Sequence, residues 1–322
     1  MNRASRFLNL CILTAAAFIL MLSPAFCDDR DYTHLVLLSD PHLPGRILPV
    51  KEKALQTINS WADVDMVAVV GDICNDLGTK EEYAFAKNFF SRLKAPLYPV
   101  TGNHDYIYED AKALGKRVRA SPEARRARLD LFKETFGLTD WRYSRKAGPY
   151  LLLFLSVDSL GSSLLAELSE ESLNWMQREL KQNADCPAIV FYHAPLKGTV
   201  MSSNRGAETA DFVAQPYWKI SEIISAHPQI FLWVSGHMHI APTNARFNDP
   251  VNLFGNQVTT IHICDMDGRS YLAESDLETT KHQAVWTNSL YLYRDLVLVK
   301  TYDHEKGQWM EGLEKRIKPG KR

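Results

Sequence analysis

Short apolar runs alternate with amphipathic segments along the first two thirds of the chain. The runs are short and rich in β-branched, Leu and aromatic residues, which is typical of buried strands; they are 34–40, 66–70, 96–100, 150–157, 188–192 and 230–234. Apolar positions at helical spacing predict helices over 51–61, 80–93 and 169–180, the last with Ser169 as N-cap. Residues 290–301 are again apolar and β-type. This alternation predicts an α/β fold with a parallel or mixed sheet.

Polar clusters follow five of these strands directly. In α/β sheets the chemistry gathers in loops at the carboxyl ends of strands, so we expect the clusters to meet there. The clusters are Asp40-Pro41-His42, Gly71-Asp72, Gly102-Asn103-His104-Asp105, His193 and Gly236-His237-Met238-His239. They offer oxygen and imidazole donors without thiolates, a set that suits Mn, Fe, Zn or Mg.

The order of these clusters resembles that of the calcineurin-like metallophosphoesterases, whose pattern is D-x-H, G-D, G-N-H-[E/D], a separate H, and G-H-x-H. Every core position of that pattern is present, and the resemblance covers about residues 34–240. It implies a four-layer α/β/β/α sandwich in which two mixed sheets pack face to face. Residues 72–104, including Gly78–Tyr83, also look like the cyclic nucleotide phosphodiesterase branch of the family.

The resemblance implies seven ligands for two divalent metal ions, each Mn, Fe, Zn or Mg. One ion would be held by Asp40, His42 and His239, and the other by Asn103, His193 and His237. Asp72 would bridge the two, because one carboxylate can give an oxygen to each ion.

The resemblance also implies a reaction, in which a metal-activated hydroxide attacks phosphorus in line. His104 would face the substrate and either stabilise the transition state or protonate the leaving group. Asp105 either supports the orientation or charge of His104, or is a carboxylate that caps the turn. Tyr106 and Tyr192 flank two of the histidines and are further candidates for substrate contact.

We therefore expect a hydrolase of a phosphorylated small molecule. A phosphomonoester and a phosphodiester both remain open as substrates, with a cyclic nucleotide or other nucleotide phosphodiester slightly favoured. The alternatives are a catalytically silent, metal-containing module that binds a phosphorylated ligand, and a scaffold of the cell envelope. Intact Asp72 and His104 argue against the silent module, and purified protein without metal would favour the scaffold.

The N-terminus has the order of a secretory signal peptide: the basic residues Arg3 and Arg6, an apolar run over 8–22, and a polar break. The run is shorter than the roughly 20 residues of a membrane span, so an uncleaved anchor is the weaker alternative. Such a segment would direct the protein to the periplasm or beyond, and its cleavage after Cys27 would leave no stable membrane span. Residues 28–322 would form one domain, with a motif core at 34–240, a strand-rich part at 241–310 and an exposed basic tail at 311–322.

The composition bears on the kinds of molecule that the protein can bind. The formal net charge is −1, and no basic motif interleaved with aromatics is present, so specific nucleic-acid binding is not expected. Residues 112–133 are the most basic stretch, either cations that steer an anionic substrate or the solvated face of a helix. Cys74, Cys186 and Cys264 would remain after cleavage, too few for a disulfide scaffold, and the pairing of any single bridge stays open. The sequence gives no sign of oligomeric state.

Overall fold

The computed structural model of the chain describes residues 30–111, 116–200, 208–248 and 252–320. The predicted signal peptide at 1–27 and Lys112 of the basic stretch lie outside these ranges. Residues Asp31–Arg322 form one compact unit. Among the helices of the described ranges, none combines the length and the apolar character that a membrane span requires.

The first sheet is mixed, with the strand order β16-β15-β14-β1-β2-β3 and β17 paired to β15. β1, β2 and β3 are parallel, whereas β14 is antiparallel to β1. The strands are β1 (Tyr32–Leu38), β2 (Val64–Val70), β3 (Leu97–Val100), β14 (Trp286–Tyr293), β15 (Val297–Asp303), β16 (Gln308–Trp309) and β17 (Lys315–Ile317).

The second sheet is also mixed and has the order β10-β11-β9-β8-β7-β6. Its four inner strands β11, β9, β8 and β7 are parallel, and the edge strands β10 and β6 are antiparallel to their neighbours. The strands are β6 (Arg142–Ala147), β7 (Tyr150–Leu155), β8 (Ala188–Tyr192), β9 (Ile230–Ser235), β10 (Leu253–Phe254) and β11 (Val258–His262).

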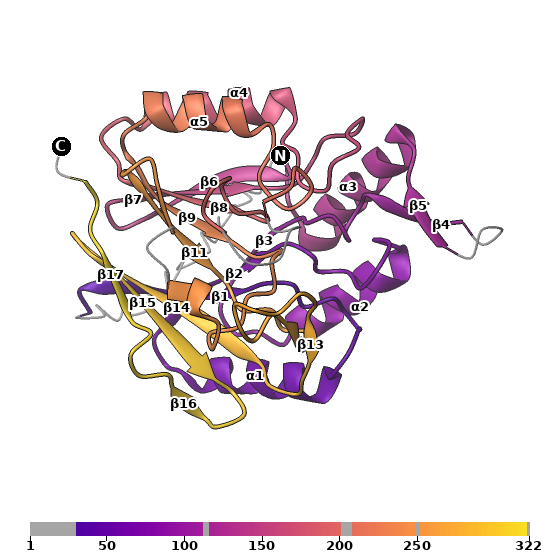
Figure 1. Ribbon diagram of the computed structural model, residues 1–322, viewed down its shortest axis with the longest axis horizontal. Helices are drawn as coiled ribbons and strands as arrows, with labels where there is room; N and C mark the ends of the chain where they lie inside the picture. The colour runs from indigo at the N-terminus through magenta and orange to yellow at the C-terminus, as the bar shows by residue number, and fades with distance from the viewer. Residues whose placement is uncertain (1–29, 112–115, 201–207, 249–251, 321–322) are drawn as a thin grey trace, which may run out of the picture. The chain divides into compact units, whose positions relative to one another are not determined.

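The two sheets pack face to face. Successive side chains of a strand point to opposite faces, so alternate residues of each strand enter the core between the sheets. Leu35 and Leu37 of β1 contact the opposing sheet, whereas Val36 and Leu38 face the helices. Figure 1 shows α4 (Glu170–Gln182) and α5 (Tyr217–Ala226) on one outer side and α1 (Leu48–Ser60) on the other. The remaining helices are α2 (Lys80–Phe90) and α3 (Pro122–Phe136), which pack against each other. The expected α/β/β/α fold is thus confirmed.

Local sequence sets the helix starts. Ser169 caps α4 as predicted, since its side chain accepts a hydrogen bond from the backbone N–H of Ser172. Thr79 and Glu82 form a reciprocal capping box at the start of α2, which leads away from the loop that carries Asp72.

Two expectations for the C-terminal part can be compared with the structure. The β-type character of residues 290–301 is confirmed, since they belong to the hairpin of β14 and β15, which turns between Tyr293 and Val297. The prediction of an exposed basic tail at 311–322 is wrong in part, because Lys315–Ile317 pair with β15, and the buried side chain of Ile317 joins the core between the sheets. Cys74, Cys186 and Cys264 are free thiols.

Candidate active site

The carboxyl ends of β1, β2, β3, β8 and β9 meet at one edge of the sandwich and bring the five polar clusters together. Backbone hydrogen bonds tie the loops to one another. Asp40 N donates to Gly71 O at 3.2 Å, and Gly236 N donates to His193 O at 2.9 Å. All seven residues expected to be metal ligands therefore lie at one site.

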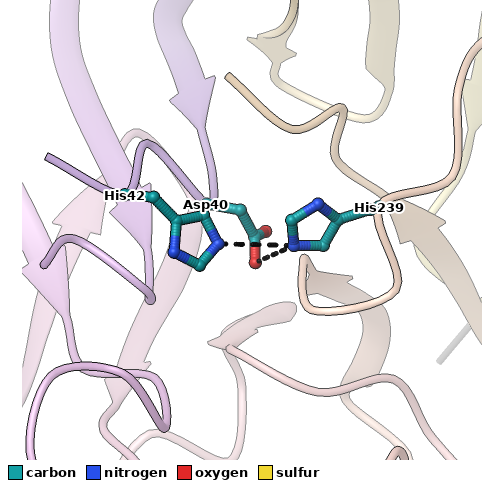
Figure 2. A group of neighbouring side chains, drawn as sticks. All are labelled: Asp40, His42 and His239. Carbon is teal, nitrogen blue, oxygen red and sulfur yellow. Dashed lines mark hydrogen bonds and ion pairs between the residues drawn. The ribbon is translucent and has the colours of Figure 1, made fainter. Parts of the chain in front are cut away.

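Asp40, His42 and His239 form the first ligand group (Figure 2). His239 Nε2 lies 3.2 Å from Asp40 Oδ1 and 3.4 Å from His42 Nε2. Two histidine nitrogens and a carboxylate oxygen thus converge from loops almost two hundred residues apart in the sequence.

The second ligand group contains Asp72, Asn103, His193 and His237. His193 Nε2 lies 3.3 Å from both Asp72 Oδ1 and Asn103 Oδ1. The rings of His193 and His237 have centroids 4.7 Å apart. A carboxylate, an amide oxygen and imidazole rings therefore face one another. The second group differs from the first by the additional amide oxygen.

Asp72 lies between the two groups. Its Oδ1 faces His193, whereas its Oδ2 is 3.8 Å from His42 Nε2. Each of its oxygens is thus directed to a different ligand group, which is the arrangement a bridging carboxylate requires.

The backbone at the site is strained. Asp40, His42, Asp72, His237 and His239 all adopt left-handed conformations, with φ between 42° and 66°. Such conformations cost free energy for residues other than glycine and persist where the surrounding structure imposes them. The strain is concentrated on the candidate ligands.

Hydrogen bonds on the outer side of the histidines fix their orientation. His193 Nδ1 donates to Val70 O at 2.9 Å, and His239 Nδ1 donates to Arg269 O at 2.8 Å. His237 uses its other nitrogen, since Nε2 lies 3.2 Å from Asp211 O. Because a carbonyl only accepts, these bonds leave the opposite nitrogen of each ring for a ligand inside the site.

The electrostatics of the site favour bound positive charge. Burial opposes ionisation of Asp40, yet the His239 and His193 charges hold the pKa of Asp40 well below its usual range. Burial would lower the pKa of His193 and of His239, but Asp72 and Asp40 respectively raise each pKa to about 9. The two carboxylates thus attract cations to positions between the ligands.

The donor set suits divalent cations. In the group of Asp40, His42 and His239, and in that of Asp72, His193 and His237, the ligand atoms lie within 4.8 Å of one another and are oxygen or imidazole nitrogen, without sulfur. Space is also reserved around the ligands: a Cβ on Gly102 would lie 2.3 Å from Asp72 Oδ1, and one on Gly71 would lie 2.3 Å from His193 Nδ1. The glycines of the motifs are needed because the ligand side chains occupy that space.

His104 is placed at the edge of the ligand groups. Its Nδ1 donates to Asn75 O at 2.9 Å, and its Nε2 lies 4.0 Å from Asp72 Oδ2 on the cleft side. Burial lowers the pKa of His104, Asp72 opposes the shift, and the Arg117 guanidinium lowers the pKa further.

Asp105 is directed to backbone groups. Its carboxylate accepts hydrogen bonds from Gly102 N at 2.7 Å and from Cys74 N at 2.8 Å. Burial, followed by the charge of Asp72, raises the pKa of Asp105 to about 7. Asp105 therefore ties the loop after β3 to the loop after β2. Tyr106 and Tyr192 are fully buried, so neither is available for the suggested contact with substrate.

The basic stretch divides into two parts. Arg117, in β5 (Lys116–Arg119), lies over the Tyr108 ring with its Nη1 3.4 Å from His104 Nδ1. The same guanidinium forms an ion pair with Asp76, and Arg117 is not among the residues that line the cleft. In α3, Arg126 is exposed, whereas Arg125 is buried and donates to Ser162 O at 2.8 Å. The solvated-face interpretation therefore fits only part of the helix.

A cleft of about 180 Å³ opens above the ligands, and several of its walls were not singled out from the sequence. The additional wall residues are Tyr108, Leu165, Phe212, Met238, Arg269, Tyr271 and Thr279. Of these, Arg269 had a signal in the sequence, because it follows the strand at 258–262 as the predicted ligands follow theirs. Met238 belongs to a cluster that the sequence shows, and Tyr108 begins the short strand β4 (Tyr108–Ala111). The remaining walls lie in segments whose path the pattern of polar and apolar residues does not fix.

The fold and the ligand groups define a metal-dependent phosphoesterase. Residues 33–241 match the calcineurin-like phosphoesterase family, so the chain belongs to this family.

Two bacterial relatives are similar over most of the chain. A probable cyclic nucleotide phosphodiesterase of Moraxella catarrhalis is 26% identical over 214 residues, which are 64% of this chain and 71% of the relative. The glycerophosphodiester phosphodiesterase GpdQ of Enterobacter lignolyticus is 23% identical over 249 residues, 76% and 79% of the two chains.

Solved structures share the fold at low sequence identity. A dimetal phosphatase from Danio rerio has a TM-score of 0.55 at 13% identity, with 90% of this chain and 100% of that chain covered. The purple acid phosphatase PPD1 from yellow lupin has a TM-score of 0.57 at 15% identity, with 89% and 54% covered.

Proposed function

We propose that the protein hydrolyses a phosphodiester with two divalent cations, and that a nucleotide diester, cyclic or open, is its substrate. The observation that carries the proposal is the position of Asp72, whose two oxygens face two separate ligand groups. A carboxylate placed in this way suits a site for a pair of cations rather than one.

Each ligand group would hold one cation. The first cation would take Asp40, His42 and His239, and the second would take Asn103, His193 and His237, with Asp72 shared. When bound, two such cations supply Lewis acidity toward a phosphoryl oxygen and lower the pKa of a water molecule. The chain's part is to fix the ligands through the carbonyl groups behind the rings and through the strained loops.

His104 is the proposed catalytic residue of the chain itself. Its Nε2 faces the cleft, while the bond from Nδ1 to Asn75 O holds the ring in place. A phosphate anion in the cleft adds negative charge and so favours the imidazolium form. In that form Nε2 can donate a proton to the departing oxygen or a hydrogen bond to the transition state.

We assign Asp105 a positioning role. Its two backbone bonds fix the loop of Asn103 and His104 relative to the loop of Asp72. It thereby orients His104 without contacting the ring.

Two further observations support a phosphodiester substrate that carries a nucleobase. The relatives named above are described as phosphodiesterases. The cleft walls include Tyr108 and Phe212, and aromatic side chains of this kind can stack on a nucleobase.

The test is hydrolysis of matched aryl phosphate monoesters and diesters by metal-stripped protein, with Mn, Zn, Fe or Mg restored separately. Two bound cations per chain and faster turnover of the diester would support the proposal. One cation per chain, or a preference for the monoester, would contradict it. Stoichiometric metal binding without turnover of any ester would instead favour a silent module that binds a phosphorylated ligand.

We also propose export through residues 1–27, on the strength of their basic, apolar and polar order. The mature chain would then begin at Asp28. Mass spectrometry of protein recovered outside the cytoplasm measures this directly, and recovery of the intact chain from the membrane fraction would point to an uncleaved anchor.

A further inference from the structure

The turn at residues 265–269 brings the guanidinium group of Arg269 to the cleft. Residues 265–269 follow β11, and β11 is parallel to β9, so the turn lies at the same edge as His237 and His239. The carbonyl of Arg269 accepts the hydrogen bond from His239 Nδ1, and Arg269 lines the cleft. The turn is therefore part of the site, although it lies outside the matched residues 33–241.

Asp267 holds the Arg269 side chain. Arg269 Nε donates to Asp267 Oδ2 at 2.8 Å, and the Asp267 side chain is almost fully buried. The other oxygen, Oδ1, accepts from Lys51 Nζ at 2.8 Å and from the backbone N–H of Arg46 at 2.9 Å. Because the Lys51 ammonium compensates the charge of Asp267, the carboxylate does not neutralise the guanidinium by itself.

The nearby carboxylate of Asp265 is engaged elsewhere. It accepts from the backbone N–H groups of Asp267 at 2.8 Å and Arg269 at 3.2 Å, and from the Ser270 hydroxyl. It shapes the turn and does not contact the guanidinium head. Across the described ranges of the chain, no acceptor lies within hydrogen-bond distance of the two Nη groups of Arg269, and 33% of its side chain is exposed.

The two ends of the cleft differ in character. On the His239 side the walls include Arg269, Tyr271 and Thr279, of which Tyr271 N donates to His239 O. On the His237 side the Phe212 ring, an apolar wall of the cleft, lies 5.3 Å from the His237 ring. The two arms of a bound diester would thus meet a cationic wall at one end and an apolar wall at the other.

We propose that Arg269 binds a second negatively charged group of the substrate, a carboxylate or a terminal phosphate, on the arm that lies on the His239 side. This inference rests on the proposed function for the scissile phosphate. Two divalent cations carry four positive charges, and Asp40 and Asp72 carry two negative ones. The remaining positive charge suffices for the single negative charge of a diester, so the scissile phosphate does not need Arg269. A guanidinium with its two Nη groups free suits bidentate binding of a separate anion.

The test compares two diesters with the same scissile bond and leaving group, methyl 4-nitrophenyl phosphate and carboxymethyl 4-nitrophenyl phosphate. Arg269→Gln should lower kcat/KM for the carboxylated diester about 10- to 100-fold, the range of a charge-assisted hydrogen bond. It should change the methyl diester about twofold at most, and Arg269→Lys should lie between. Arg92→Gln, the same change at a distant surface pair with Glu52, should alter neither substrate. An equal loss for both diesters would place Arg269 at the scissile phosphate, and no loss for either would give it a structural role; both results overturn the proposal.

Equilibrium binding separates this inference from the proposed hydrolysis. The probes are 3-phosphonopropionate and ethylphosphonate, which differ by one carboxylate and are not hydrolysed. Calorimetry on Mn-loaded protein should show tighter binding of 3-phosphonopropionate, and Arg269→Gln should abolish that preference while its metal content stays that of the wild type. If the wild-type protein binds both phosphonates equally, the proposal is wrong even if diesters are hydrolysed. If the preference is present and depends on Arg269, the proposal stands even if no diester is turned over.

Discussion

The ammonium group of Lys51 lies 2.8 Å from Oδ1 of Asp267, and neither side chain reaches the solvent. Lys51 belongs to α1, and its Nζ also donates to the carbonyl oxygen of Pro41, between two of the candidate ligands. Burial lowers the pKa of Lys51, and the charge of Asp267 opposes that shift. One buried cation thus joins the first metal-ligand loop to the turn that carries Arg269.

Lys51→Met should destabilise the protein strongly. The substitution leaves the buried Asp267 with the partly exposed Arg269 as its remaining countercharge, and breaking a buried ion pair in this way costs about 3–5 kcal/mol. Urea unfolding of the metal-free protein measures the free energy of unfolding. Lys53→Met on the exposed side of the same helix is the control, and equal losses for the two variants would contradict the structural role of Lys51.

Asp72→Asn should remove most of the activity and release metal. The amide lacks the charge that Asp72 presents to both ligand groups, so loss of several kcal/mol of electrostatic stabilisation, about a thousandfold in rate, is expected. Metal content by mass spectrometry and aryl diester turnover check this. Asp130→Asn, on the exposed surface of α3, should change neither quantity. Full metal occupancy together with an unchanged rate would exclude a bridging Asp72.

The candidate ligands were accessible from the sequence because each follows an apolar strand. Within one sheet, parallel strands end at the same edge, so Asp40 after β1 lies near Asp72 after β2, and His193 after β8 lies near His237 after β9. That the two edges meet depends on how the sheets pack, which the local pattern does not show. The same reasoning applies to Asp267 after β11, although the resemblance to the family ends at about residue 240.

Other features depend on partners that are distant in sequence. The pairing of β17 with β15 rests on the edge that β15 offers, which no local pattern shows. Arg125 belongs to a run of basic residues yet is buried, because backbone carbonyls of Ala120 and Ser162 accept its donors. The cleft walls Tyr108 and Phe212 lie in a hairpin and a loop, and contacts with Arg117 and His237 fix their positions.

His104→Ala should leave the metals bound and slow hydrolysis about 10²- to 10⁴-fold, the usual contribution of a general acid. If Nε2 protonates the departing oxygen, the loss grows as the leaving group becomes more basic. A series of aryl diesters with leaving groups of different pKa measures this dependence. His227→Ala, at the end of α5, is the control. Equal slowing across the series would leave only charge stabilisation as the role of His104.

His262 should make the protein less stable in mild acid. Burial, followed by the charge of Lys315, lowers the pKa of this ring to about 4, against about 6.5 for an unfolded histidine. The folded state therefore binds fewer protons between these two values, so this contribution to stability is present above pH 6.5 and is lost as the pH falls toward 4.

Between pH 7 and pH 5 the loss from His262 amounts to about 2 kcal/mol. His262→Gln should reduce the difference between the free energies of unfolding at these two pH values by that amount. Urea unfolding at pH 7 and pH 5 measures the difference for both proteins. If the variant shows the same difference as the wild type, the ring does not titrate as its burial requires.

Gly102→Ala should weaken metal binding by a steric effect alone. The added Cβ would lie 2.3 Å from Asp72 Oδ1 and 2.7 Å from His193 Nε2, and the φ of Gly102 lies outside the left-handed region. The two ligands must move, and displacement of this kind typically costs 10- to 100-fold in metal affinity. Competition with a chelator measures the affinity. Gly161→Ala, where a Cβ would meet no atom within 4 Å, should leave the affinity unchanged. Unchanged affinity in Gly102→Ala as well would show that Asp72 and His193 do not bind metal from the positions they occupy here.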